Sequence, residues 1–122
     1  MTAFTPAGWP DGVRPPGAPD WEATATAFLF DCCPADFRAY AVLRRHPPVL
    51  ARFAVHFVAG QARAAQEGLA AVRTSLQGLV AVEVVESAAE AWLEQSARLA
   101  RTTRAVNLVE EALRGQVFRP RL

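Results

Sequence analysis

Two adjacent thiols, Cys32 and Cys33, are the residues of this chain best suited to redox or metal chemistry. A structural zinc site uses four nitrogen or sulfur ligands at recognisable spacing, and the chain adds only His46 and His56. Neighbouring residues on a helix point about 100° apart, so the two thiols do not easily converge on one ion. A following helix start and Arg38 both favour the thiolate of Cys33. Free cysteines are more commonly small buried side chains, so we expect structural burial and no metal site.

A row of glutamates is the second candidate for chemistry. Glu83, Glu86, Glu90 and Glu94 recur at three- and four-residue spacing and would share one helix face, as in di-metal carboxylate bundles. Such sites also need a Glu-x-x-His motif, and this segment has no histidine. The chain has no G-x-S-x-G nucleophile motif either. The sequence therefore predicts a solvated acidic face, no catalytic residue, no cofactor and a protein that is not an enzyme.

The composition is that of one globular domain. The chain has 122 residues, of which 52% are hydrophobic, and this length is typical of a single domain. All 13 basic residues are arginine, and lysine and isoleucine are absent, which is typical of a GC-rich genome. The net charge of +1 does not indicate a nucleic-acid or membrane protein. No apolar run reaches the ~20 residues that span a bilayer, and the first residues lack a secretory pattern, so we expect a cytoplasmic protein.

Proline and glycine divide the chain into an arm, a helical domain and a tail. Residues 1–19 hold five of the nine prolines and three of the seven glycines, which predicts an extended arm. This arm is either disordered or lies across the domain or a partner. Residues 20–115 are expected to form a single domain, and residues 116–122 a short tail. Caps and proline positions predict two short helices at the start of the domain, over about 21–32 and 34–45.

Two long helices, over about 48–77 and 82–114, are expected to follow, with glycines 78 and 115 near their ends. Apolar residues recur at alternating spacings of three and four in the first helix and every seven residues in the second, as in a coiled coil. The short connection between them predicts an antiparallel hairpin in an all-α fold. The seam residues are Val55, Val58, Ala62, Ala65, Leu69, Val72 and Leu76 in the first helix, and Val85, Trp92, Leu99, Val106 and Leu113 in the second.

A hairpin of two helices leaves much of its apolar surface facing water, and the short helices can cover only one end. Unburied apolar surface of this extent indicates self-association, and two-fold dimers are the commonest oligomers. We therefore expect two hairpins to pack through their seams into a dimeric four-helix-bundle-like assembly. The alternative is a compact monomeric bundle that uses all four helices.

Charge is distributed unevenly along the chain. Residues 37–56 and 97–122 each carry a net charge of +4, whereas residues 1–36 and 66–96 each carry −4. An antiparallel hairpin brings both positive stretches to its open end and one acidic stretch to its turn. Three roles for the basic end remain open. The acidic arm neutralises it, an acidic protein surface binds it, or it binds a phosphate backbone. The candidate partner or phosphate contacts are Trp9, Arg44, Arg45, Arg101, Arg104, Arg119 and Arg121.

A resemblance rests on three stretches of the sequence, namely VLRRHPP at 42–48, LVEEALRG at 108–115 and the terminal PRL. They are similar to small helical proteins of GC-rich bacteria that carry no assigned function. The resemblance implies a self-contained bacterial protein and no particular activity or site. We expect a non-enzymatic helical interaction or adaptor module that self-associates through its seams. The alternative is a small nucleic-acid-associated regulator that uses the arginine-rich open end.

Overall fold

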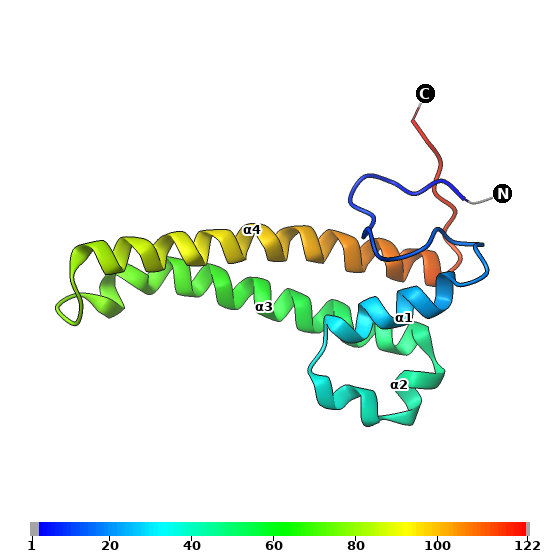
Figure 1. Ribbon diagram of the computed structural model, residues 1–122, viewed down its shortest axis with the longest axis horizontal. Coiled ribbons are helices and arrows are strands. Elements are labelled where there is room, and N and C mark those ends of the chain that lie inside the picture. Colours follow the sequence, from blue (N-terminus) through cyan, green and yellow to red (C-terminus); the bar gives the residue numbers. More distant parts are fainter. Residues whose placement is uncertain (1–2, 122) are drawn as a thin grey trace.

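The computed structural model describes residues 3–121 (Figure 1). Within that range its secondary-structure elements are all helices. The predicted all-α class is therefore confirmed, as is the pair of long helices in contact with each other. The elements in chain order are helix α1 (Trp21–Asp31), the 3-10 helix η1 (Ala35–Ala39), and helices α2 (Ala41–Arg45), α3 (Pro47–Leu76) and α4 (Val82–Leu113).

Helices α3 and α4 form an antiparallel hairpin that spans the length of the molecule (Figure 1). Their 30 and 32 residues correspond to about 45–48 Å at 1.5 Å per residue. Pro47 and Pro48 occupy the first turn of α3, where a missing backbone N–H costs little. Gly78, with φ of 77°, adopts the left-handed conformation that reverses the chain before α4. Local residue chemistry thus sets both the start of α3 and the turn.

The segment before α3 differs from the single helix expected over residues 34–45. Tyr40 is extended, with φ of −83° and ψ of 115°, and separates η1 from α2. A continuous α-helix would direct Phe37 and Leu43 about 120° apart, because they are six residues apart. The break lets Phe37 pack on α3 while Leu43 is only 1% exposed. Tertiary packing therefore overrides the local helical tendency here.

The main hydrophobic core lies in the open half of the hairpin, away from the turn. It is formed by α1, α2, the first part of α3 and the end of α4, and its fully buried large side chains are Leu29, Leu43, Leu50, Val58, Val106 and Val109. Figure 1 shows α1 and α2 beside α3 in this half, whereas the half nearest the turn is a bare pair of helices. The fold is therefore thick at one end and thin at the other.

The N-terminal arm lies across the domain at the open end. Trp9 packs against Trp21 and Phe118, with ring centroids 6.3 and 6.0 Å apart, and its indole N–H donates to the carbonyl of Val13 at 2.9 Å. Arg104 of α4 donates to the carbonyl of Ala7 at 2.9 Å. The sequence left open whether the arm is disordered or lies across the domain or a partner. The described part of the arm packs on its own domain.

Candidate functional site

The seam residues mostly hold the hairpin together. Helices α3 and α4 run side by side along the hairpin and contact each other (Figure 1). The deeply buried seam residues have no surface to offer a partner, so an interface must use other residues. Six of the twelve are buried within the chain, namely Val58, Ala65, Val72, Val85, Leu99 and Val106; Val55, Ala62, Leu69, Leu76 and Leu113 are half-buried; Trp92 is 36% exposed.

A cluster of aromatic side chains lies on the surface where η1 meets α3. The ring of Phe37 makes edge-to-face contacts with Tyr40, Phe53 and Phe57, at centroid distances of 5.9, 5.9 and 4.9 Å. Tyr40, Phe53 and Phe57 nevertheless remain 53%, 42% and 39% exposed. These four residues are called the aromatic cluster below. Exposed aromatic side chains held rigidly in this way are typical of the centres of protein interfaces.

The sequence indicated only part of this cluster. The short helices were expected to cover one end of the hairpin, and at this end Phe53 and Phe57 contact Phe37 of η1 but remain 42% and 39% exposed. Phe37 and Tyr40 were not singled out. The available signal was the three-residue spacing of Phe37 and Tyr40 beside the four-residue spacing of Phe53 and Phe57, which places aromatic side chains on neighbouring turns.

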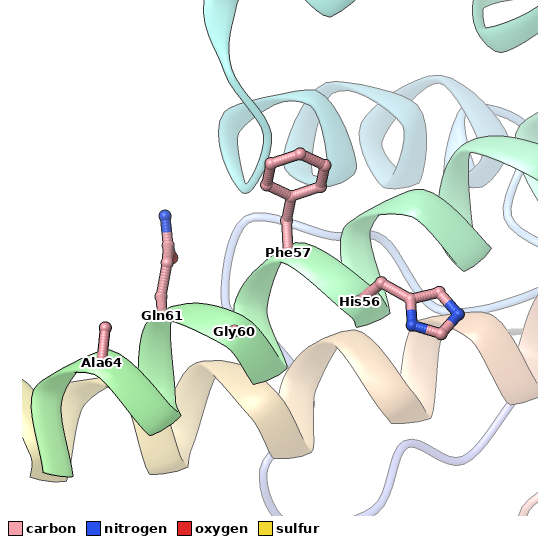
Figure 2. Close-up of a pocket in the computed structure, with 5 residues that line it drawn as sticks. All are labelled: His56, Phe57, Gly60, Gln61 and Ala64. Atoms are coloured by element: carbon pink, nitrogen blue, oxygen red, sulfur yellow. The ribbon is translucent and has the colours of Figure 1, made fainter. Parts of the chain in front are cut away.

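A shallow hollow of about 400 Å³ adjoins the aromatic cluster on α3, lined by His56, Phe57, Gly60, Gln61 and Ala64 (Figure 2). Phe57, Gln61 and Ala64 project from the same side of the helix, and Gly60 leaves the backbone uncovered between them. A second hollow, of about 250 Å³, also includes Gln61 and Ala64 and reaches Trp92 on α4. The two hollows therefore adjoin at Gln61 and Ala64.

The exposed side of α3 continues from the aromatic cluster as a strip of small, uncharged residues. Its members share one side of the helix because they recur at spacings of four and seven. At Gly68 the indole of Trp92 lies so close that a Cβ atom would collide with its ring. The absence of a side chain at Gly68 thus allows Trp92 to cover the seam. This small-residue strip consists of Gly60, Ala64, Ala71 and Ser75, and Gly68 lies at its edge, covered by Trp92 of the same chain.

The two thiols are half-buried against the core, at the end of α1. Burial raises the pKa of Cys32 to about 11, with smaller contributions from Cys33 and Asp31. Burial also raises the pKa of Cys33, although Arg38 opposes the shift. The activation expected from Arg38 is therefore outweighed by desolvation, and neither thiol is a strong nucleophile at neutral pH. Among residues 3–121, no three metal-ligating side chains gather at one place.

The acidic row on α4 is solvent-exposed in the structure. Both carboxylate oxygens of Glu86 accept hydrogen bonds from Arg73 of α3, at 3.0 and 2.9 Å. The hydrogen bonds and the charge of Arg73 lower the pKa of Glu86. These groups form an ordinary surface ion pair across the hairpin near its turn, with no geometry suited to holding a metal ion.

The candidate phosphate contacts do not come together on one surface. Figure 1 shows α2, which carries Arg44 and Arg45, on one side of the hairpin and the C-terminal tail, with Arg119 and Arg121, on the other. Arg104 is engaged with the arm, since it donates to the Ala7 carbonyl. Arg44 donates to the carbonyl of Arg38 at 2.7 Å. Arg101 is exposed. Trp9, the remaining candidate contact, packs within its own chain.

Comparison with known proteins assigns no function to this arrangement. No family model, curated protein or solved structure matches the chain. Within the described residues, no helix combines the length and apolar character needed to cross a bilayer.

Proposed function

We propose that this protein is a non-enzymatic interaction module that acts as a homodimer. The observation that carries the proposal is the aromatic cluster, in which the rings of Tyr40, Phe53 and Phe57 are 39–53% exposed. The bare half of the hairpin nearest the turn, residues 66–96, called the turn half below, adds further exposed apolar surface. It contributes only a narrow line of buried side chains to the fold, while Leu79, Val82, Val84 and Leu93 are 52–73% exposed. Exposed apolar side chains of this density on so slender a structure favour burial against a partner.

The surface that we assign to this association is the exposed side of α3. It joins the aromatic cluster to the small-residue strip without a charged side chain within the strip. Rigid aromatic side chains supply contact area at low cost in conformational entropy, and small residues let a partner approach the helix closely. The buried seam residues support this surface indirectly, because they hold α3 in place.

Light scattering coupled to size-exclusion chromatography tests the proposal. We expect a mass of twice 13.2 kDa, with dissociation on dilution. Substitution Ala64→Glu places a charge in the centre of the proposed surface and should yield the monomer. Ala70→Glu is the matched control, since Ala70 is also an exposed alanine of α3 but lies outside the strip. A wild-type protein that remains monomeric at every concentration would refute self-association.

A further inference from the structure

The proposed self-association leaves open how two copies are oriented. The molecule has a thick open half, where η1 and α2 stand beside α3, and a thin turn half without such a layer (Figure 1). We propose that two copies pack antiparallel about a two-fold axis near the middle of α3. The aromatic cluster of each copy then lies on the small-residue strip of the other. This inference rests on the proposed dimerisation and specifies its partner surfaces.

Side-chain size along α3 supports the antiparallel arrangement. Phe53, Phe57, Ala64 and Ala71 follow one another on a single side of the helix, so this side is bulky at its start and small toward the turn. An antiparallel partner places bulky side chains opposite small ones at both ends of the contact. A parallel partner would place phenylalanines opposite phenylalanines and leave a gap between the small residues near the turn. Close packing at an interface core favours the antiparallel pairing.

Charge supports the same orientation. The turn half carries one arginine and five glutamates, a net charge of −4. Residues 37–56, which include α2 and most of the aromatic cluster, carry four arginines and no acidic residue. Arg38 and Arg52 pair with Asp31 and Glu110 of the same chain, which leaves Arg44 and Arg45 of α2 to meet a second copy. Antiparallel packing brings these opposite charges together twice, whereas parallel packing places like charges side by side. Complementary charges of this kind fix the orientation of a complex more than its affinity.

The position of Glu67 connects this charge to the proposed contact. Glu67 is exposed and lies between Ala64 and Ala71 of the strip, and the antiparallel copy would bring Arg44 and Arg45 toward it. A two-fold interface of this kind is closed, because each copy uses both of its surfaces at once. The assembly therefore stops at two copies and does not extend into a filament.

Cross-linking tests the orientation. The background variant carries Cys32→Ala and Cys33→Ala, and Ala39→Cys, next to Tyr40, is combined with Ala71→Cys in the strip. Treatment with a short bis-maleimide should produce a covalent dimer whose cross-linked peptides join position 39 to position 71. Ala71→Cys alone should remain unlinked, because the two copies of position 71 lie at opposite ends of the contact.

The outcomes separate this inference from the proposed function. A dimeric mass with cross-links between the two copies of position 71, or with none between 39 and 71, would overturn the antiparallel arrangement and leave self-association standing. A monomeric mass without any cross-link would overturn both.

Charge reversal provides a second test of the same arrangement. Glu67→Arg should weaken dimerisation about tenfold at low salt, whereas Glu90→Arg, an equal charge change on α4 of the same half, should weaken it much less. Phe57→Ala should weaken it about 30-fold, as expected for an interface hot spot. Equal effects of Glu67→Arg and Glu90→Arg would contradict the assigned contact.

Discussion

The ion pair between Arg52 and Glu110 joins the start of α3 to the end of α4, and its two partners differ in burial. One guanidinium nitrogen of Arg52 donates to both carboxylate oxygens of Glu110, at 2.8 and 2.9 Å. The Glu110 side chain is 10% exposed and that of Arg52 is 46% exposed. Arg114 is the nearest other cation, at 3.7 Å from the carboxylate. We expect the two single substitutions to be unequal for this reason.

Removal of Arg52 leaves a buried carboxylate, whereas removal of Glu110 leaves an arginine that can turn into water. Loss of one partner of a fully buried pair costs about 3–5 kcal/mol. Arg52→Ala should cost about 2–3 kcal/mol, because Arg52 is half-exposed and Arg114 can move closer. Glu110→Ala should cost about 1–1.5 kcal/mol, the net value of a typical hydrogen bond, because water solvates the arginine that is left. The double substitution to alanine should be more stable than Arg52→Ala alone, since it removes the stranded charge.

Urea denaturation followed by circular dichroism measures these differences. Protein concentration must be the same for every variant, because dimerisation would otherwise contribute to the free energy of unfolding. A larger loss for Glu110→Ala than for Arg52→Ala would refute the reasoning. So would a double variant that is less stable than Arg52→Ala, because the buried carboxylate could not then be the source of the cost.

Three further perturbations have definite expected outcomes. Gly68→Ala should lower the free energy of unfolding by about 1 kcal/mol, because the new methyl group displaces Trp92. Gly60→Ala should raise it by up to about 1 kcal/mol, because its methyl group would meet only the end of an arginine side chain. Urea denaturation compares the two variants, and equal effects would contradict the packing at Gly68. Stability should fall as the pH rises from about 9 toward 11, because the thiol of Cys32 ionises in the unfolded chain before it does so in the folded one. The fall should be smaller in Cys32→Ala, and an unchanged pH profile would show that burial does not raise this pKa. Trp9→Ala should destabilise the protein by about 2 kcal/mol and speed hydrogen exchange of the backbone amides of the arm, and unchanged exchange would show that other contacts hold the arm.

The hairpin could be predicted from sequence because its determinants are local and repetitive. Apolar residues at coiled-coil spacing define both long helices, and Gly78 ends the first with a left-handed residue. Pro47 and Pro48 define the start of α3, which begins within one residue of the expected position. Each of these signals acts within a few residues, so no knowledge of tertiary contacts was needed.

Features that depend on distant contacts could not be predicted in this way. The break at Tyr40 arises because Phe37 and Leu43 both find places against α3, which propensity does not encode. The seam pattern is the same whether two helices pair within one chain or between chains, so periodicity could not tell which side chains would already be buried. The exposed side of α3 can be identified only from the contacts that bury its opposite side.

The attachment of the arm has a consequence for synthesis of the protein. Ala7 is held by Arg104, a residue 97 positions later in the chain. Trp9 likewise packs against Phe118, so it has no such neighbour while only the first part of the chain has left the ribosome. The chain therefore completes its open end only after α4 and the tail have been made, and until then the Trp9 ring has only Trp21 of its two aromatic partners.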